Sequence, residues 1–537
     1  MTAEVTVAAL DPAAYESTLR SLVEDKVASR LTAQDHTLWG PDAEPEAAKR
    51  LSWVGLASSS RPLVDEVAAL RDKLVSAGVD HVVLCGMGGS SLAPEVICAT
   101  AAVELTVLDS SDPDYVRTAL ADRLDRTVVV VSSKSGSTVE TDSQKRAYEG
   151  AFSAAGIDPA ARIVVVTDPG SPLDGQARAD GYTVINADPD VGGRYSALTA
   201  FGLVPSGLAG VDIAGLLDEA ASVEGALQSD DASNPGLQLG ALIGQAALAG
   251  ADKLVLADAG SGIPGFGDWA EQLIAESTGK LGKGVLPVVV EGQDAPNFSP
   301  STADSVLAAL GADESPSGTS GYGAAVKGSL GAQMLLWEYA VAVAGRVIGI
   351  NPFDQPDVES AKSAARELLD GSPGAEPADF VDGAVEVRAT PGLLGDATTL
   401  EGAVAALLGA LDPDHGYLAV MAYLDRLADA SLAEVRAPLA RRTGRPVTFG
   451  WGPRFLHSTG QYHKGGPPTG VYLQVTGAPH EDLDIPGRPF TFGGFIAAQA
   501  AGDAKVLADH ARPVLRLHLT DRAAGLAQLT AALTAGA

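Results

Sequence analysis

Hydroxyl side chains cluster where an apolar run ends, in the stretch TVVVVSSKSGSTVET of residues 127–141. The polar side chains that follow the valines are Ser132, Ser133, Lys134, Ser135, Ser137 and Thr138. A buried strand that ends there and gives way to a helix near Val139 gathers free backbone N–H groups and hydroxyls around one point. Such a helix N-terminus attracts an anion, and Lys134 adds a positive charge. The stretch therefore predicts a phosphate site.

A simpler interpretation is that one hydroxyl caps the helix. Ser137 or Thr138 would then be the cap, with Glu140 in the first turn. One cap needs a single hydroxyl, whereas this turn offers several, so we favour the anion site. The segment lacks the G-x-x-x-x-G-K-[ST] spacing of an ATP-binding loop.

A glycine turn precedes the hydroxyl turn, in LCGMGGSSLAP. It contains Gly86, Gly88, Gly89 and Ser90. The G-x-G-x-x-G fingerprint of dinucleotide-binding folds fails here because Ser91 replaces its third glycine, although Asp109 matches the ribose-binding acid of that fingerprint. A dinucleotide site stays open as the less favoured alternative. A glycine turn paired with a hydroxyl turn favours a monophosphate, provided that the two preceding strands are neighbours.

A sheet must position these turns, and apolar runs of strand length recur along the chain. They are HVVLCG from His81, LTVLDSS from Leu105, TVVVVSS from Thr127, RIVVVTD from Arg162, YTVIN from Tyr182, DKLVLADAGSG from Asp252, GVLPVVVEG from Gly284 and GRVIGINPFDQ from Gly345. Helical segments rich in alanine and leucine separate them, which predicts parallel sheets buried on both faces. Ligands bind such sheets at the carboxyl ends of the strands, where both turns lie.

The chain has 537 residues, too many for one ordinary core. We predict an α/β protein with a helical N-terminal segment over 1–60, a first α/β unit over 61–215, a second over 216–375, and a smaller C-terminal α/β unit over 376–537. Residues 371–400 are rich in Pro, Gly and Asp and indicate a linker. The C-terminal unit contains the strand-like runs GYLAVMAYLD, PVTFGWG, GVYLQVTG and PVLRLHLTD.

Charge and cysteine content narrow the functional classes. The net charge of −31 repels nucleic acid and anionic membranes, so an anionic substrate needs a local basic or amide-lined site. The two cysteines, Cys85 and Cys98, cannot form a disulfide framework in a chain of this size. No run of eighteen apolar residues occurs, and the N-terminus does not resemble a signal peptide. We therefore expect a cytoplasmic protein without nucleic-acid or membrane partners.

The two turns resemble the phosphate-binding turns of sugar isomerase (SIS) domains, and later segments narrow the resemblance to the glucose-6-phosphate isomerase family. VGGRYSALTAFGL (191–203) resembles the G-G-R-[YF]-S segment of that family. WAEQLIAESTGK (269–280) resembles its E-S-N-G-K motif, and NPFDQPDVESAK (351–362) its F-D-Q-x-G-V-E-x-x-K signature. GPRFLHSTGQYHKGG and FTFGGFIAAQAAGDAKVL are similar to the isomerase part of transaldolase and glucose-6-phosphate isomerase fusion proteins. The resemblance implies two SIS-type three-layer αβα domains with mainly parallel sheets.

The resemblance also implies a reaction and a set of site residues. It implies reversible conversion of glucose 6-phosphate and fructose 6-phosphate, without a metal or organic cofactor. Glu276 would move the proton, Arg194 would stabilise the oxyanion, and Lys362 would help to open the ring. The residues assigned to the phosphate are Gly88, Gly89, Ser90, Ser133, Lys134, Ser135 and Thr138, with Gln272 and Gln355 at the sugar.

The ring-opening histidine departs from the family pattern. Family members usually carry it between the E-S-N-G-K and F-D-Q motifs, but no histidine lies between Lys280 and Lys362. An L-H-S-x-G-Q string occurs later, at 456–461, so we favour His457, with His463 as second candidate. Smaller departures from the family motifs are Ser91, Ala93, Thr278 and Asp357.

Each assignment has a structural alternative. Glu276 lies at the i, i+4 spacing from Lys280 that favours an ion pair on a helix surface. Arg194 follows two glycines and suits bracing a loop, a lone histidine such as His457 is more often structural, and Lys362 on a helix is usually solvated.

The whole chain likewise has functional alternatives. One is a phosphosugar-binding regulator of the same fold without catalysis, which the displaced histidine motivates. Another is an isomerase that also accepts mannose 6-phosphate, and a dinucleotide oxidoreductase is the least favoured. Members of the family are usually homodimers that share active-site residues, whereas His457 in the C-terminal unit is available in cis. The sequence leaves both arrangements open.

Overall fold

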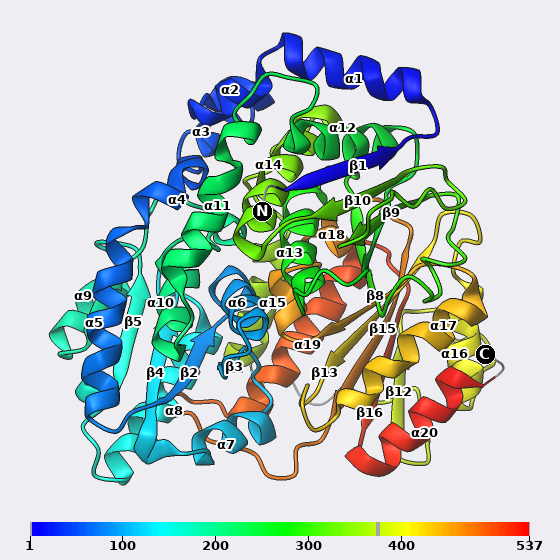
Figure 1. Ribbon diagram of the computed structural model, residues 1–537. Coiled ribbons are helices and arrows are strands. Elements are labelled where there is room, and N and C mark those ends of the chain that lie inside the picture. Colours follow the sequence, from blue (N-terminus) through cyan, green and yellow to red (C-terminus); the bar gives the residue numbers. More distant parts are fainter. Residues whose placement is uncertain (1–2, 372–375, 536–537) are drawn as a thin grey trace.

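The protein is built on three sheets in the computed structural model, which describes residues 3–371 and 376–535 (Figure 1). The first sheet is parallel and has the order β3-β2-β4-β5-β6. Its strands are β2 His81–Gly86, β3 Thr106–Leu108, β4 Thr127–Ser132, β5 Ile163–Thr167 and β6 Thr183–Asn186. Strands β2 and β4 are neighbours, with Gly86 opposite Ser132. The glycine turn and the hydroxyl turn therefore leave adjacent strands at the same edge.

Helices cover both faces of the first sheet. Every residue of β2 and β4 is buried, because alternate side chains pack against opposite helical layers. One layer contains α5 Pro62–Ser76, α6 Leu92–Thr100 and α10 Ala200–Ala209, and the other contains α7 Pro113–Ala121, α8 Val139–Ala154 and α9 Pro172–Ala179. The five strands predicted from His81 to Tyr182 are confirmed.

The second sheet has the order β1-β10-β9-β7-β8. Its strands are β1 Glu4–Ala8, β7 Lys253–Asp258, β8 Leu286–Val290, β9 Ser305–Leu310 and β10 Gly323–Lys327. The prediction of a purely helical N-terminal segment is wrong at β1, which pairs antiparallel with β10 and completes the sheet edge. Strands β9 and β10 were not predicted, because their alanine-rich sequences have weak strand propensity.

One predicted strand is a helix. The run from Gly345 contributes to the last turn of α14 Leu330–Ile348, which ends at Gly349 with a φ of +76°. The run continues a longer apolar segment, whose Leu, Ala and Met residues favour a helix. The helix is buried along almost its whole length, so its apolar residues show no helical periodicity.

The third sheet has the order β11-β12-β16-β15-β13-β14. Its strands are β11 Phe380–Asp382, β12 Val385–Ala389, β13 Tyr417–Tyr423, β14 Val447–Trp451, β15 Gly470–Gly477 and β16 Val514–Leu519. The four predicted runs form its parallel part, β13 to β16. The predicted linker 371–400 contains a β11–β12 hairpin instead, because β12 pairs antiparallel with β16 through Val385 and Val387, which are buried.

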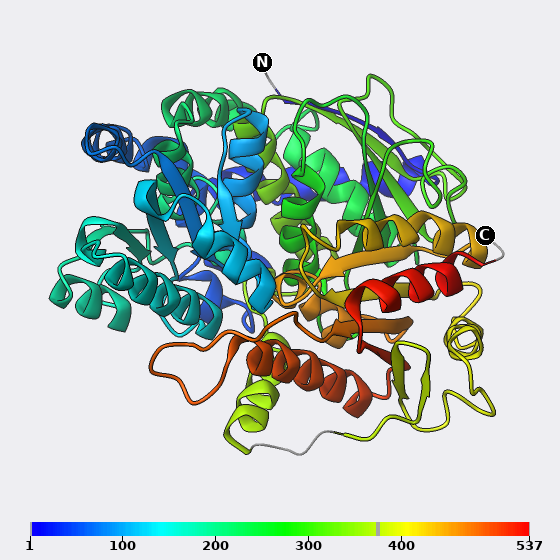
Figure 2. The ribbon, with the colours of Figure 1, turned by 90° about the horizontal axis from the view of Figure 1, so that it is seen from below.

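Helices α16 Leu400–Gly409, α17 Arg436–Thr443 and α20 Arg522–Thr534 pack on one face of the third sheet, and α19 Phe492–Asp509 packs on the other. The loop 478–491, between β15 and α19, extends across the first α/β unit (Figure 2). It contacts α7 and α8, where Arg117 pairs with Glu481 and Arg488 pairs with Asp142.

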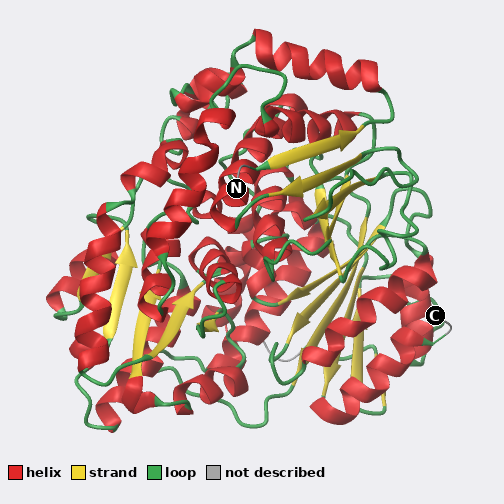
Figure 3. Ribbon diagram, viewed as in Figure 1, coloured by secondary structure: helices red, strands yellow, loops and turns green. Residues whose placement is uncertain are grey.

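Helices surround the sheets (Figure 3), and the second and third sheets share one hydrophobic core. The remaining helices are α1 Pro12–Glu24, α2 Val27–Thr32, α3 Glu44–Ala47, α4 Leu56–Ser59, α11 Ile213–Leu227, α12 Pro235–Leu248, α13 Phe266–Thr278, α15 Val358–Gly371 and α18 Gly460–Gly465. The short 3₁₀ segments are η1 His36–Trp39, η2 Ser52–Gly55, η3 Gly88–Ser90, η4 Leu124–Arg126, η5 Pro159–Ala161, η6 Gly193–Tyr195, η7 Ala430–Val435 and η8 Arg454–His457. Within 3–371 and 376–535, no helix has both the length and the apolarity needed to cross a membrane.

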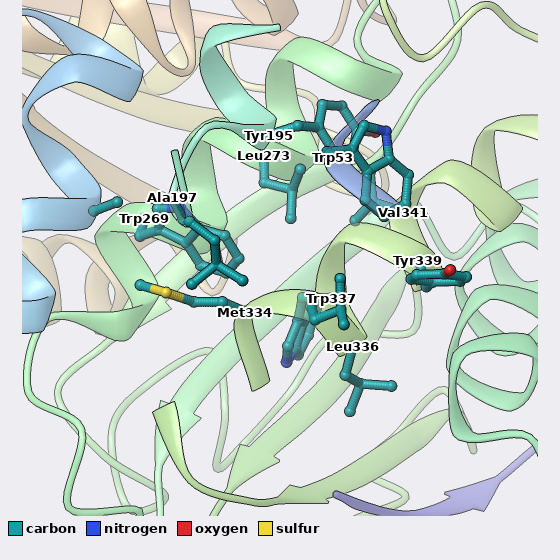
Figure 4. Close-up of a cluster of buried hydrophobic side chains, with 14 of the residues drawn as sticks. Trp53, Tyr195, Ala197, Trp269, Leu273, Met334, Leu336, Trp337, Tyr339 and Val341 are labelled. Carbon is teal, nitrogen blue, oxygen red and sulfur yellow. The ribbon is translucent and has the colours of Figure 1, made fainter. Parts of the chain in front are cut away.

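Aromatic side chains, among them Trp53 and Tyr195, belong to a cluster of buried hydrophobic residues (Figure 4). Trp53 stacks on Tyr195 with ring centroids 5.0 Å apart. The hydroxyl of Tyr195 lies 3.3 Å from that of Ser277. Because Tyr195 follows Arg194 and Ser277 follows Glu276 in the chain, this contact fixes the backbone that carries both charged residues.

Candidate active site

The hydroxyl turn surrounds the N-terminus of α8. Thr138 occupies the N-cap position with extended φ and ψ angles of −73° and 110°, but its side chain makes no capping hydrogen bond. The Ser133 hydroxyl donates weakly to Thr138 Oγ1 at 3.4 Å, and the Ser135 and Ser137 hydroxyls lie 2.7 Å apart. The interpretation that Thr138 simply caps the helix is therefore wrong, and the turn keeps its hydroxyls grouped at a helix N-terminus.

Lys134 does not point its charge at this turn. Its amine forms an ion pair with Asp168 at 2.7 Å and donates to the carbonyl of Pro189 at 3.0 Å. Burial raises the pKa of Asp168, and the amine of Lys134 opposes that shift. The side chain thus ties the turn to the loops after β5 and β6. Its contact with a phosphate remains a prediction.

Arg194 and Glu276 form a buried pair. Arg194, on η6, is 4% exposed, and its Nε lies 3.3 Å from Glu276 Oε2 on α13. Gln272, one helical turn earlier, donates through Nε2 to the same carboxylate oxygen at 3.3 Å. Arg194 also donates to the carbonyl of Asp354 at 3.2 Å and to Gln355 Oε1. The guanidinium of Arg194 and the amide of Gln272 therefore both stabilise the charged form of Glu276.

Lys280 is not the surface partner that the i, i+4 spacing suggested. Its amine is buried and donates to the carbonyls of Asn351 and Asp354 at 2.7 and 2.6 Å, and to Asp354 Oδ1 at 2.7 Å. Burial, followed by the nearby charge of Arg194, lowers the pKa of Lys280 to about 8. Glu276 is itself buried, so the alternative of an ion pair on the helix surface is wrong. Lys280 instead anchors the loop before α15.

His457 comes from the C-terminal unit and reaches the first α/β unit. Its Nε2 lies 3.1 Å from Oε1 of Glu140, in the first turn of α8. Gly88 has a φ of +56°, and a Cβ atom there would lie 2.8 Å from Gln272 Nε2 and 3.0 Å from His457 Cβ. A glycine is therefore required where the glycine turn approaches both side chains. His457 and Gln272 converge on the turn beside the predicted phosphate site.

The second histidine candidate lies in the core. His463 is 3% exposed, and its Nδ1 lies 3.0 Å from the hydroxyl of Tyr417. Burial, with added repulsion from Lys464 and Arg512, lowers the pKa of His463 to about 3. A histidine that stays neutral at physiological pH and is surrounded by tyrosines is suited to packing rather than to proton transfer.

The structure describes the predicted residues Gly89 and Ser90, whereas it describes only the backbone position of Lys362. Gly89 packs against the backbone of Gly193, where a Cβ atom would lie 1.9 Å from the carbonyl oxygen, and Ser90 is half-buried in the same turn. Lys362 lies on α15, but its side chain is outside the described part of the structure.

Asp109, the acid that the dinucleotide interpretation requires, is engaged in ion pairs. Asp109 is buried and forms ion pairs with Arg454 at 2.9 Å and Arg426 at 3.3 Å. Both arginines also pair with Glu95 of α6, at 2.5 and 2.9 Å. Asp109 therefore holds the C-terminal unit to the first α/β unit, and the match to a ribose-binding acid is wrong.

Sequence reasoning missed several residues around the site. Glu140 was considered only as a first-turn carboxylate, although its place directly after the hydroxyl turn was a usable signal. Gln461 donates to Asp357 Oδ2 at 2.6 Å and accepts from the Asp357 backbone N–H at 3.0 Å, so the aspartate that replaces the family glycine has a partner. Gln499 donates to Glu140 Oε1 at 2.8 Å. The contacts of Gln461 and Gln499 had no local sequence signal.

The chain is similar to known proteins in sequence and in fold. A probable glucose-6-phosphate isomerase from Haloarcula marismortui is 33% identical over 235 residues, which are 43% of this chain and 52% of that protein. Another, from Methanococcus maripaludis, is 28% identical over 352 residues, covering 55% of this chain and 80% of that protein. The chain is related to glucose-6-phosphate isomerases. The match therefore spans about half the length of the first of these relatives.

The fold of this chain is also similar to that of a solved glucose-6-phosphate isomerase. The crystal structure of such an enzyme from Chlamydia trachomatis aligns with a TM-score of 0.54 at 20% identity, covering 68% of this chain and 87% of that one. No family model matches the chain. The predicted α/β fold with mainly parallel sheets is confirmed.

Proposed function

We propose that this protein interconverts glucose 6-phosphate and fructose 6-phosphate. The observation that carries the proposal is the convergence on one glycine turn of a buried Arg194–Glu276 pair, held by Gln272, and a His457–Glu140 pair. A carboxylate and an imidazole, each with a fixed partner, are the acid–base groups that an aldose–ketose isomerisation requires. The related sequences support the choice of a phosphorylated hexose.

The phosphate would bind at the N-terminus of α8. Ser133, Ser135 and Thr138 are grouped there, and the helix is long enough for its dipole to favour an anion. Ser90 lies on the neighbouring turn. These turns break no bond. Their binding energy would hold the reacting carbons in register with Glu276, so losing it should lower kcat as well as affinity.

Ring opening would use His457. With Nε2–H donating to Glu140, the neutral imidazole carries its lone pair on Nδ1. That nitrogen would exchange a proton with the sugar hydroxyl and ring oxygen as the C1–O5 bond of glucose 6-phosphate breaks. Lys362, on α15, would assist at the ring, as the family resemblance implies.

Proton transfer would use Glu276. The carboxylate would take the proton from C2 of the open aldose, leaving an enediolate. It would return a proton to C1 while the hydroxyl proton passes from O2 to O1, which gives the ketose. A positioned base contributes roughly 10²- to 10⁴-fold in rate. The guanidinium of Arg194, 3.3 Å from Glu276, would stabilise the oxyanion by a factor on the order of 10² or more.

The contact between His457 and Glu140 is made within one chain. Glu140 and His457 are joined across the α8–η8 contact, so we propose that the site works in cis even if the protein is a homodimer. Mixing the Glu276→Gln and His457→Asn variants should then restore no activity. Recovery of about a quarter to a half of wild-type activity, as expected for shared sites, would show that His457 acts in trans.

The decisive test is turnover of fructose 6-phosphate, with glucose 6-phosphate measured by coupled oxidation. We expect the wild-type protein to convert fructose 6-phosphate to glucose 6-phosphate. The kcat of Glu276→Gln should be lower by at least about 10²-fold. The matched control is Glu271→Gln, a neighbouring carboxylate on α13. A wild-type protein that binds the sugar phosphate without converting it would support the regulator instead. Near-normal activity of Glu276→Gln would refute the mechanism.

A further inference from the structure

Helix α19 places a glutamine against the His457–Glu140 pair. Gln499 donates through Nε2 to Glu140 Oε1 at 2.8 Å, and the same oxygen lies 3.1 Å from His457 Nε2. Gln499 is 4% exposed and Glu140 is 7% exposed, so both hydrogen bonds are shielded from water. One carboxylate oxygen therefore receives donors from two segments of the C-terminal unit.

The amide orientation follows from the carboxylate. An ionised carboxylate only accepts hydrogen bonds, so the amide NH₂ of Gln499 must face Glu140 and its Oε1 must face away. Oε1 is buried and has no hydrogen-bond partner among the described residues. An unsatisfied buried acceptor destabilises the fold. Packing alone therefore does not account for a glutamine here, whereas the hydrogen bond to Glu140 does.

We propose that Gln499 is a positioning residue that keeps Glu140 ionised and aimed at His457. This inference rests on the proposed isomerase function. The Gln499 N–H stabilises negative charge on Glu140 Oε1 and so weakens the attraction of that oxygen for a proton. Glu140 then holds the Nε2–H tautomer of His457 without trapping the imidazole in its charged form. Gln499 reaches the substrate only through this chain of hydrogen bonds.

Other charged groups surround the His457–Glu140 pair, but a substitution of Gln499 changes none of them. On α13, Glu271 accepts from Ser458, next to His457, at 3.1 Å. On η8, Arg454 is engaged by Glu95 and Asp109, and on α8, Asp142 pairs with Arg146 and Arg488. On α19 itself, Asp503 pairs with Lys464 at 2.5 Å. All of these groups are unchanged in a Gln499 variant.

The first test is the pH profile of kcat in Gln499→Leu. Without the amide donor, the oxygen of Glu140 becomes more basic and the doubly protonated imidazole of His457 is stabilised. Protonation of either group blocks ring opening, so the acid limb should move to higher pH by about one unit. On the acid limb we expect kcat to fall by up to about tenfold, and we expect KM to change by less than about twofold, because a positioning group does not touch the substrate.

Two further variants separate positioning from packing. Gln499→Glu keeps the shape but sets a carboxylate against Glu140, so the acid limb should move further in the same direction. The control is Gln474→Leu on β15, a buried glutamine whose Nε2 donates to the Ala500 carbonyl at 2.9 Å. It loses a similar hydrogen bond and should leave the acid limb in place. An unmoved acid limb in both Gln499 variants would overturn the proposal.

An NMR titration tests the same contact without turnover. Imidazole signals of histidine-labelled protein are followed with pH, and the His457 signal is identified by its loss in His457→Asn. Its midpoint should rise in Gln499→Leu and rise further in Gln499→Glu. An unchanged midpoint refutes the positioning role even in an active enzyme. An inactive wild-type protein that shows the shift refutes the proposed isomerase function but supports the contact.

Discussion

Two histidines on neighbouring short helical segments differ in every feature that governs proton transfer. His457 ends η8, and its side chain is 12% exposed and faces the carboxylate of Glu140 in another α/β unit. His463 on α18 is 3% exposed, hydrogen-bonds the hydroxyl of Tyr417 and stacks on its ring at a centroid distance of 5.8 Å. The first contacts an anion, whereas cations and neutral hydroxyls surround the second.

This difference shows that partners, rather than residue type, decide what a histidine does. Burial, together with Lys464 and Arg512, disfavours the charged imidazole at His463 and lowers its pKa to about 3. A carboxylate partner, such as Glu140 beside His457, sets the tautomer and compensates a developing positive charge. Only the pairing of His457 with Glu140 supports a group that alternately takes and gives a proton.

The largest expected effect comes from removing the imidazole at the site. His457→Asn should lower kcat by roughly 10²- to 10⁴-fold, because ring opening loses its proton-transfer group. Steady-state kinetics with fructose 6-phosphate measures this change, and circular dichroism checks that the fold is retained. Activity close to wild type would place the ring-opening group elsewhere and remove the contrast between the two histidines.

Changing the partner of His457 tests the contrast next. Glu140→Gln should lower kcat by about 10²-fold, because a neutral amide neither fixes the tautomer nor compensates the imidazolium. The acid limb of the pH profile of kcat should also move to lower pH, because His457 loses the anion that favours its doubly protonated form. The matched control is Glu149→Gln, further along α8, which should leave both kcat and the profile unchanged.

Substitution of the core histidine should change stability and leave catalysis intact. His463→Phe preserves the aromatic packing but removes the hydrogen bond to Tyr417, whose hydroxyl keeps its 2.7 Å contact with Tyr472. We expect a loss of about 1–3 kcal/mol in the free energy of unfolding, measured with urea. Within about twofold, kcat should be unchanged. A fall in kcat comparable with that of His457→Asn would contradict the structural role.

The smallest effect concerns Glu271, which contacts Ser458 beside His457. Burial, with repulsion from Asp268, raises the pKa of Glu271 from 4.5 to about 8. The folded state therefore binds this proton more tightly than the unfolded state, so stability falls as pH rises from about 4.5 to 8. Glu271→Gln should remove part of that fall. Urea unfolding at acidic and mildly alkaline pH measures the slope, and equal slopes in both proteins would show that Glu271 does not titrate in this range.

Much of the first sheet and its turns could be predicted because their signals are local. The valines of β4 and the hydroxyls after Ser132 are adjacent in sequence, and parallel pairing with β2 places them beside Gly86. The strands β9 and β10 and the end of α14 escaped prediction, because alanine-rich strands and fully buried helices lack a clear periodicity.

Part of the grouping of side chains in the candidate site was predictable for the same reason. Arg194, Gln272 and Glu276 lie in recognisable motifs, and the structure brings them together. The partner of His457 and the role of Asp109 were not predicted, because both depend on how the C-terminal unit docks on α6 and α8. Arg454, which holds Asp109, and His457, which contacts Glu140, are on the same short segment η8.

The sequence by itself determined the strands that end in the glycine and hydroxyl turns, the helix that begins at Val139, and the charged side chains that the motifs carry. Backbone propensity and side-chain chemistry act over a few residues, so they can be read directly. Only the tertiary structure decided which histidine contacts Glu140, that Lys134 pairs with Asp168, and that Gln499 donates a hydrogen bond to Glu140. Those outcomes depend on packing between units far apart in the chain, where burial and charge pairing select one arrangement.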